Sequence, residues 1–280
     1  MGHMKNIMFL NNWGEGTTDL LQRYSRQTPN NSGIWKDVKG TLDAKAADYY
    51  ILLDGLGHHD TSLPIEKTIF VKREPDFISR YRTNYIHSID WTDTNCGITW
   101  WINKTYDELK SIPYPDKSKD ISCIVSSKHG HRNRYVQSLF SSESPIDLYG
   151  RIHNSELFGD NYKGILNYNG NCKFKGLIDY RYSIVLENSR QLNYWTEKLA
   201  DAYIAWCVPL YWGCPNIEDY FPKNSYYSLD INNLNQLNDI KDIITQPVDV
   251  DALTKSRNLV LDNYNIWEVI HNKIISIESQ

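Results

Sequence analysis

One segment constrains the fold of this chain more than any other: YRYSIVLENSRQLNYWTEKLADAYIAWCVPLYWG, residues 180–213. It reads as a buried strand, a polar loop, an amphipathic helix and a second buried strand. In the helix, apolar side chains recur at i, i+3, i+4 and i+7, which predicts one stripe packed on a sheet: Leu199, Ala202, Tyr203 and Trp206. Such a strand–helix–strand unit favours an α/β fold with a parallel sheet.

The same alternation of strands and helices runs through the rest of the chain. The first half predicts a helix capped by Thr17 or Thr18, and three strands, at Ile7–Leu10, within 47–57 and within 68–77. Residues 90–119 show no clear period. The second half predicts a strand over 121–127, a helix over 131–140 and a strand over 146–150, before the unit over 180–213.

This pattern predicts two α/β domains that face a central cleft. A proline-bearing linker, residues 114–120, separates a first domain over 1–118 from a second over 119–250. Residues 251–280 have helical periodicity and are expected to pack back on the first domain. The first four residues are typical of an expression remnant and are set aside. Ligands of such folds bind beyond the carboxyl ends of the strands.

Composition excludes several classes of protein. The net charge of −4 and pI near 6.1 argue against a general binder of nucleic acid or anionic membranes. No apolar run is long enough to span a bilayer, although peripheral membrane association stays compatible with the sequence. Five cysteines without CxxC spacing indicate reduced thiols in a cytoplasmic protein, and neither a disulfide framework nor a zinc site.

Polar residues stand where the elements of residues 180–213 join. Glu187 and Asn188 end a strand, and Thr196, Glu197 and Lys198 occupy the first turn of the helix. A helix N-terminus attracts anions such as phosphate, and a lysine there opposes the helix dipole unless an anion answers it. The alternative is an ordinary first-turn acid beside a solvated lysine, with Glu187 and Asn188 as turn formers.

Two further sites carry candidate chemistry. Lys128, Arg132 and Arg134 follow a strand and enter a helix, where an arginine can grip a diphosphate bidentately; a solvated basic face is the alternative. Glu74 leaves a strand just before Pro75, which restricts it to extended geometry, so it is either a general base at the cleft or a surface acid. The adjacent histidines 58 and 59 do not predict a metal site. Dinucleotide, P-loop, hydrolase-elbow and zincin motifs are absent.

Residues 180–222 resemble the donor-binding signature of the α1,3/α1,4-fucosyltransferase family. The ordered matches are Glu187-Asn188-Ser189, Asn193-Tyr194, Thr196-Glu197-Lys198, Val208-Pro209, Trp212-Gly213 and Phe221-Pro222. The resemblance extends with gaps from about residue 121 onward, through HRNRYVQSLF and DLYGR. The first 118 residues match weakly, mainly through FVKREPDF.

The resemblance implies a GT-B fold, two Rossmann-like domains with the donor held mainly by the second. It implies transfer of fucose from GDP-fucose, with inversion, to a hydroxyl of an oligosaccharide or glycolipid. No divalent metal or other cofactor is required. The context implied is cytoplasmic assembly of bacterial surface polysaccharide or lipopolysaccharide, at most peripheral to the inner membrane face.

The resemblance also assigns roles to individual residues. Arg132 or Arg134, with Lys198, would neutralise the diphosphate, and Glu74 would deprotonate the acceptor. The donor-binding set would be Arg132, Arg134, Glu187, Asn188, Ser189, Tyr194, Thr196, Glu197 and Lys198. Two alternatives stay open: the same fold acting on another nucleotide sugar, and a non-catalytic glycan-binding module.

Overall fold

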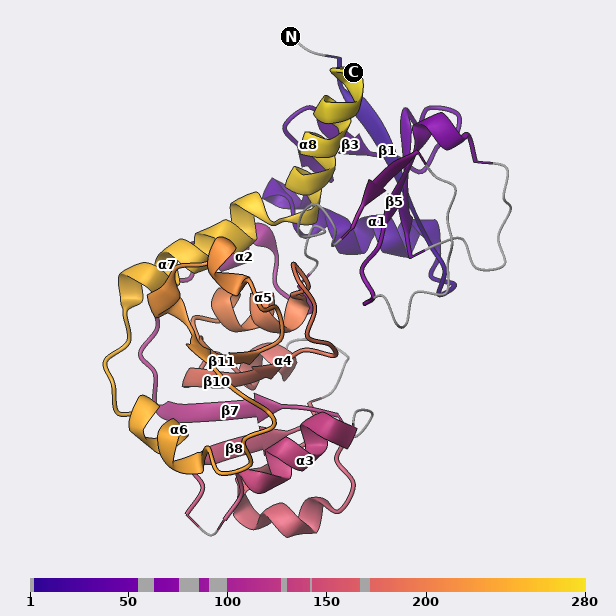
Figure 1. The fold of residues 1–280 in the computed structure, drawn as a ribbon. Helices are drawn as coiled ribbons and strands as arrows, with labels where there is room; N and C mark the ends of the chain where they lie inside the picture. The colour runs from indigo at the N-terminus through magenta and orange to yellow at the C-terminus, as the bar shows by residue number, and fades with distance from the viewer. Residues whose placement is uncertain are drawn as a thin grey trace.

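The computed structural model describes residues 3–54, 63–75, 86–90, 100–126, 130–141, 143–166 and 172–280. Within these ranges the chain forms two α/β domains, stacked end to end, each built on its own sheet (Figure 1). This confirms the α/β class and the two Rossmann-like domains expected from the sequence.

The first sheet has the strand order β2-β3-β1-β4-β5-β6. Its central strands pair in parallel, for example Ile7 with Tyr49 and Ile51 with Ile69, while β2 and β3 pair antiparallel. The strands are β1 Lys5–Asn11, β2 Ile34–Trp35, β3 Val38–Gly40, β4 Tyr49–Leu53, β5 Thr68–Val71 and β6 His87–Ile89.

The second sheet has the order β12-β11-β10-β7-β8-β9, and every pair in it is parallel among the described residues. Its central strand β10 is buried at six of seven positions, as a parallel strand covered on both faces must be. The strands are β7 Lys119–Ile124, β8 Ile146–Tyr149, β9 Tyr162–Gly164, β10 Tyr180–Leu186, β11 Val208–Trp212 and β12 Tyr227–Ser228.

The helices cover these sheets and connect the strands. The α-helices are α1 Thr17–Ser25, α2 Tyr106–Ser111, α3 Gly130–Ser138, α4 Cys172–Lys175, α5 Glu197–Ile204, α6 Leu237–Ile243, α7 Val250–Asn258 and α8 Ile266–Glu278. Short 3₁₀ segments are η1 Pro29–Asn31, η2 Ile65–Lys67, η3 Ser155–Asn161, η4 Ile217–Asp219 and η5 Lys223–Ser225, and Leu259–Asn263 is a π-helical turn before α8.

Two local expectations were wrong. The N-cap of α1 is Gly16, in place of the expected Thr17 or Thr18. Glycine has no side chain, so no side-chain hydrogen bond caps this helix. The region 90–119 contains helix α2, which a capping box begins: Thr105 Oγ1 accepts from the Glu108 N–H, and the Glu108 carboxylate accepts from the Thr105 N–H. The Thr-x-x-Glu spacing is the sequence signal for this helix.

The carboxyl-terminal helices run along both domains. Helix α7 lies beside the second domain, and α8 lies against β1 and β3 of the first, so that the two chain ends are close together (Figure 1). Trp267 of α8 is fully buried; its indole N–H donates to the Tyr24 carbonyl at 2.9 Å, and its ring meets Phe9 edge-on. Asn265 Nδ2 donates to the Gln27 carbonyl at 2.8 Å. The α8 helix therefore completes the core of the first domain.

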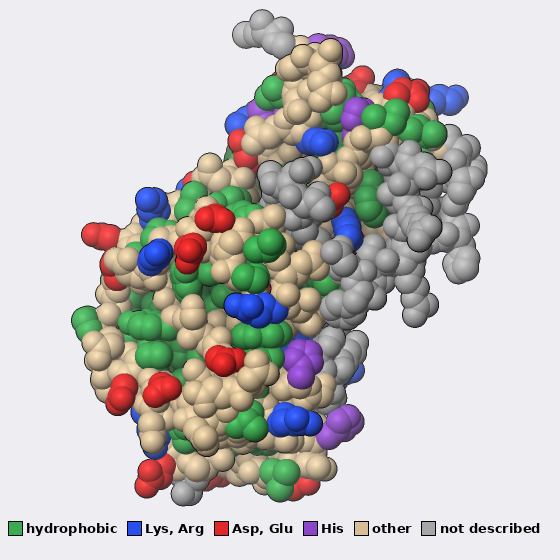
Figure 2. All heavy atoms as spheres, in the orientation of Figure 1, with side chains coloured by type: hydrophobic (Ala, Val, Ile, Leu, Met, Phe, Trp, Pro, Cys, Tyr) green, Lys and Arg blue, Asp and Glu red, His purple; other side chains and the backbone are tan. Residues whose placement is uncertain are grey.

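Several sequence-based expectations about the surface can be compared with the structure. None of the helices in the described ranges is long and apolar enough to cross a membrane. Basic and acidic side chains are interspersed over the second domain on the face shown in Figure 2.

Cys123, Cys207 and Cys214 are free and buried, as predicted; Cys96 and the side chain of Cys172 lie outside the described part.

Candidate functional site

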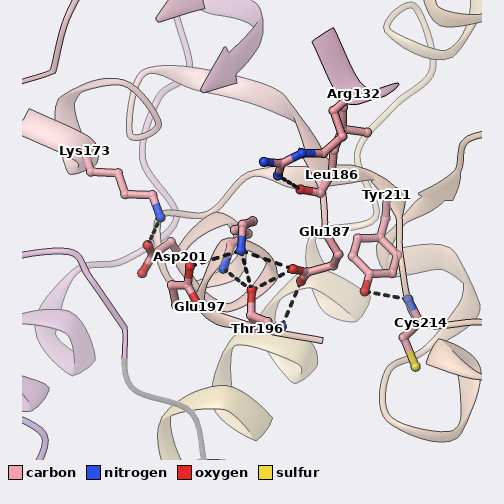
Figure 3. A network of polar contacts seen from close by, with 10 residues as sticks. Arg132, Lys173, Leu186, Glu187, Thr196, Glu197, Asp201, Tyr211 and Cys214 are labelled. Carbon is pink, nitrogen blue, oxygen red and sulfur yellow. Dashed lines mark hydrogen bonds and ion pairs between the residues drawn. The ribbon is translucent and has the colours of Figure 1, made fainter. Parts of the chain in front are cut away.

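The joint between β10 and α5 is organised around a buried carboxylate. Glu187 follows β10 and is fully buried; its two oxygens accept from the Thr196 backbone N–H at 2.8 Å and from the Thr196 hydroxyl at 2.7 Å (Figure 3). Burial raises the pKa of Glu187, while Lys198 opposes that rise. Glu187 is therefore a fixed part of the joint, in contrast to a mere turn former.

Lys198 is held between two carboxylates. Its Nζ lies 3.4 Å from Glu187 Oε2, 3.2 Å from Glu197 Oε1 and 3.1 Å from Thr196 Oγ1. Burial lowers the pKa of Lys198, but the charges of Glu197 and Glu187 outweigh it and the net shift is upward. For Glu197, burial is outweighed by Lys198 and Lys173, which together hold its pKa at about 2.

This arrangement corrects one expectation from the sequence. A first-turn lysine was expected to need an external anion, yet Lys198 already forms ion pairs with Glu187 and Glu197. The lysine was also expected not to be part of a packed interior, but only 26% of its side chain is exposed. Its role toward a diphosphate stays a prediction, and that role no longer follows from an unpaired charge.

Thr196 connects the members of this group. As N-cap of α5 its hydroxyl accepts from the Lys198 N–H at 3.3 Å, and it also donates to Glu187. Thr196→Val is expected to lower the free energy of unfolding by about 2 kcal/mol, since it removes a cap and leaves a buried carboxylate short of a donor. Urea denaturation checks this loss, and Thr196→Ser should restore most of it.

Arg132 enters the same region from α3. It is buried, and its Nη1 donates to the Leu186 carbonyl at 2.8 Å, just before Glu187 (Figure 3). Its Nε is buried without a hydrogen-bond partner in the part of the chain that the structure describes. Burial lowers the pKa of Arg132, and Glu187 raises it. A buried guanidinium with an unused donor is unusual in a finished interior and suits a site that receives an acceptor group from outside.

Gly213 is required by the close approach of its neighbours. A Cβ at this position would stand 2.4 Å from Tyr211 Oη and 2.5 Å from the Cγ of Glu187. Tyr211 Oη in turn accepts from the Cys214 N–H at 2.9 Å. The Trp212-Gly213 match in the sequence thus has a steric reason, because the turn after β11 packs directly on the buried glutamate.

Glu74 lies three residues after the end of β5 in the first domain, and its side chain is exposed. Partial desolvation, followed by the negative charge of Asp54, raises the pKa of Glu74, and Arg73 lowers it; the charges of Glu197 and Lys198 also act on it. The pKa of the predicted base therefore depends in part on the charges of two residues of the second domain, Glu197 and Lys198. The Asp54 carboxylate accepts three hydrogen bonds from Arg73: from the Arg73 backbone N–H at 2.8 Å, from Nε at 3.0 Å and from Nη2 at 2.8 Å.

The other predicted donor residues have different surroundings. Arg134 is exposed on α3, whereas Arg132 is buried, so the two arginine side chains lie in different environments: the first in solvent and the second in the protein interior. Asn188 and Ser189 are half-buried in the loop after β10. Tyr194 is 1% exposed and packs with the core of the first domain. Lys128 and the histidines 58 and 59 lie outside the described residues.

Sequence reasoning missed a second buried ion pair beside this group. Asp201 is fully buried; it pairs with Lys173 of α4, and its Oδ1 accepts from the Trp101 N–H at 3.0 Å. Asp201 stands four residues after Glu197, on the same helix face, which is the signal that was available in the sequence. Helix α5 is buried from Leu199 to Ile204, beyond the single stripe that was predicted, because α7 and the π-helical turn after it pack on the side that faces away from the sheet.

Metal binding was not predicted for this site. In the described ranges, no group of three or more histidine, cysteine, aspartate and glutamate side chains has a metal-binding arrangement. The cations present are those of Arg132, Lys173 and Lys198.

The second domain can be compared with protein families. Residues 114–251 match the glycosyltransferase family 10 (fucosyltransferase) C-terminal domain. These residues, just under half of the chain, are similar to that domain, and we refer to them below as the family 10 domain. The family 10 domain contains Arg132 and the whole Glu187–Lys198 group, while Glu74 lies outside it.

The chain is also similar to curated proteins over part of its length. Alpha-(1,3)-fucosyltransferase FucT from Helicobacter pylori is 33% identical over 106 residues, which are 38% of this chain and 20% of that protein. The curated relatives that this chain matches are covered over only 20% to 24% of their length.

The fold of both domains also has solved counterparts. An alpha1,3-fucosyltransferase crystallised with GDP-fucose matches with a TM-score of 0.55 and 15% identity, over 99% of this chain and 91% of that one. A DNA-modifying β-glucosyltransferase matches with a TM-score of 0.52 and 12% identity, over 97% and 99% of the two chains. The two-domain architecture is therefore the GT-B fold, as expected.

Proposed function

We propose that this protein is an inverting glycosyltransferase that moves L-fucose from GDP-fucose to a hydroxyl of a glycan. The observation that carries the proposal is the Lys198–Glu197–Glu187 group, which lies within the residues that match the fucosyltransferase domain. The charges of Glu197 and Lys198 also act on the pKa of Glu74 in the first domain. The fucosyltransferase family of that domain supports the donor, and the solved fucosyltransferase with GDP-fucose supports the fold in which it binds.

In the proposed reaction, Glu74 takes the proton of the acceptor hydroxyl. The oxygen attacks the anomeric carbon of fucose, the bond from that carbon to the β-phosphate oxygen breaks, and GDP leaves with the electron pair. Direct displacement inverts the anomeric centre. Arg132 and Lys198 stabilise the negative charge that grows on the diphosphate, because fixed cations act most strongly where charge develops in the transition state.

The remaining predicted residues support the donor in this scheme. Glu197, kept ionised by Lys198 and Lys173, accepts hydrogen bonds from donor hydroxyls, and Asn188 and Ser189 line the same loop. Glu187 and Thr196 fix Lys198. Tyr194 is buried among the core of the first domain and Arg134 is exposed on α3, so in this scheme Arg132 is the arginine of the pair that serves the diphosphate. Because two side-chain cations serve the diphosphate, we propose that no divalent metal is needed and that chelators leave turnover unchanged.

A donor panel tests the proposal directly. Calorimetry should show GDP binding, and hydrolysis or transfer should be seen with GDP-fucose. Cleavage of UDP-glucose and not of GDP-fucose would instead favour another nucleotide sugar, an alternative that the fold similarity to a β-glucosyltransferase keeps open. Absence of GDP binding at millimolar concentration would favour a glycan-binding module.

The acceptor and location belong to the same proposal. We place the acceptor among oligosaccharides or glycolipids of a bacterial surface polysaccharide or lipopolysaccharide; one similar protein, the Helicobacter pylori α-(1,3)-fucosyltransferase, is bacterial. The protein would act in the cytoplasm, with at most peripheral contact at the inner membrane face, and cell fractionation tests this.

The charge of Asp54 provides a test of the base. Because the pKa of Glu74 is raised, turnover should fall as pH drops through that pKa, above the usual glutamate range. Asp54→Asn removes a negative charge that raises this pKa, so the acid limb of the kcat/KM profile should move to lower pH. An unmoved acid limb in this variant would assign that limb to another group.

A further inference from the structure

Two tryptophans lie at the surface in the described part of the chain. Trp13 is 42% exposed and Trp101 is 51% exposed, whereas the other described tryptophans are buried or half-buried. Trp13 follows β1 in the first domain, and Trp101 lies shortly before α2. An exposed indole ring offers a flat apolar face and a polar N–H to a ligand.

Trp13 is held rigidly despite its exposure. The Cζ of Arg73 stands over its ring, 4.6 Å from the centroid, and its indole N–H donates to Glu15 Oε2 at 2.9 Å. Its backbone N–H donates to Asn11 Oδ1 at 3.0 Å. Arg73, which stacks on this fixed ring, directly precedes in sequence the residue proposed as the base, Glu74.

Trp101 is held in a similar way. The Cζ of Arg23 is 5.2 Å from its ring centroid, and its backbone N–H donates to Asp201 of α5. Arg23 also pairs with Glu15, at 2.8 Å between Nη2 and Oε1. Glu15 therefore connects the two tryptophans, and we call Trp13, Glu15, Arg23 and Trp101 the tryptophan strip.

The strip extends from the first domain to the donor domain. At one end, Arg73 joins it to Asp54 and Glu74; at the other, Asp201 joins it to the helix that carries Glu197 and Lys198. An attacking hydroxyl must reach this same region. The strip is therefore continuous with the proposed reaction centre.

The chemistry of the strip suits a carbohydrate. A pyranose ring has an apolar face of C–H groups and an edge of hydroxyls, and indole rings offer flat apolar surfaces with polar side chains beside them. The rings are already fixed by hydrogen bonds and cation–π contacts, so little side-chain entropy is lost when a ligand stacks on them. The strip carries one carboxylate, Glu15, which is paired with one guanidinium, Arg23, so it has no net charge to attract a polyanion such as nucleic acid.

We propose that the tryptophan strip is the acceptor subsite, with Trp13 under the sugar that is attacked and Trp101 under a sugar farther along the glycan. This inference rests on the proposed function, because it assigns the acceptor side of the same reaction. It names an oligosaccharide of more than one sugar as the acceptor, bound by stacking as well as by hydrogen bonds.

The test is glycan binding by the full chain saturated with GDP, on an array of galactose- and N-acetylglucosamine-terminated glycans of one to six sugars. Binding is measured in place of turnover because Arg73, which stacks on Trp13, also acts on the pKa of Glu74. The variants are Trp13→Ala, Trp13→Phe and Trp101→Ala. Leu157→Ala, in η3 of the second domain, is the matched change of an exposed apolar side chain.

The expected pattern separates the two rings. Trp13→Ala should weaken binding of every retained glycan about 10-fold, and Trp101→Ala should do so only for the longer ones, since burial of one sugar face is lost. Trp13→Phe, which keeps a flat ring, should stay within about threefold of the wild type. Leu157→Ala should bind like the wild type, and GDP affinity should be equal in all variants.

Contrary results are also distinct. Equal glycan binding by the wild type and both alanine variants overturns the inference, and so does a GDP-saturated wild type that retains no glycan. In both cases GDP binding by calorimetry leaves the proposed function standing. A wild type that does not bind GDP overturns the proposed function itself, and this inference with it.

Discussion

Lys198→Met is expected to lower kcat for transfer from GDP-fucose by about 10³-fold, because it removes a cation from the diphosphate at the stage when negative charge develops. Lys198 lies within 3.4 Å of Glu187 and 3.2 Å of Glu197, so its position is fixed before any donor binds. Single-turnover assays at saturating GDP-fucose measure this effect. Lys241→Met, on α6 and paired with the exposed Glu143, is the control and should turn over normally.

The same substitution should reduce stability, since it leaves the buried Glu187 without its cation. We expect a loss of about 3 kcal/mol in the free energy of unfolding, reduced from a fully buried pair by the partial exposure of Lys198. The double variant Lys198→Met/Glu187→Gln should regain most of that stability and none of the activity. This variant separates the catalytic effect from the structural one.

The pH dependence of the single variant has a definite sign. Burial raises the folded-state pKa of Glu187, and loss of Lys198 raises it further. The folded protein then binds a proton more readily than the unfolded chain, so stability should increase as pH falls toward the ordinary glutamate pKa. A stability that is independent of pH, or an active double variant, would contradict the assigned role of Lys198.

Glu74→Gln is expected to lower transfer by about 10³-fold while GDP binding is retained, because a neutral amide does not accept the acceptor proton. The residue is exposed and outside the family 10 domain, so the fold should be unaffected. Transfer rates and calorimetry with GDP, measured on the same preparations, provide the two readings. Glu66→Gln, an exposed glutamate of η2, is the control in the same domain.

Two outcomes would count against Glu74 as the base. Near-normal turnover in Glu74→Gln would show that another group takes the proton. Loss of GDP binding would show that Glu74 holds the donor instead. Retention of slow GDP-fucose hydrolysis with loss of transfer is the expected pattern, because water needs no positioned acceptor.

Much of the fold follows from local pattern. The strand–helix–strand unit over 180–213 appears as β10, α5 and β11, because continuous apolar runs are stable only when both faces of a strand are covered. Helix α1 spans Thr17–Ser25, in the region where a helix was predicted with its cap at Thr17 or Thr18. The N-cap of α1 was misplaced because Gly16 precedes two better-known cap formers. Helix α2 was not predicted because it is only six residues long and aromatic residues around it hide any helical periodicity. Its capping box, Thr105 and Glu108, was present in the sequence as a signal.

The candidate site was only partly predictable. Glu187, Thr196 and Lys198 are close in sequence, and their strand-end and helix-start positions bring them together in any parallel unit of this kind. Asp201 and Lys173 were missed because a buried ion pair between two helices leaves no local periodicity. The distinction between Arg132 and Arg134 also needed the structure, since which side of α3 packs on β10 decides which arginine is buried.

The sequence by itself determined that this chain forms parallel α/β units with polar residues at the strand–helix joint, because apolar periodicity and helix caps act over a few neighbouring residues. Only the tertiary structure decided how the lysine of that joint is paired. Lys198 meets Glu187 because β10 and α5 pack together, and its charge reaches Glu74 because α8 and the segment around Trp101 connect the two domains. Contacts between loops far apart in sequence depend on the packing of whole domains, which no local pattern records.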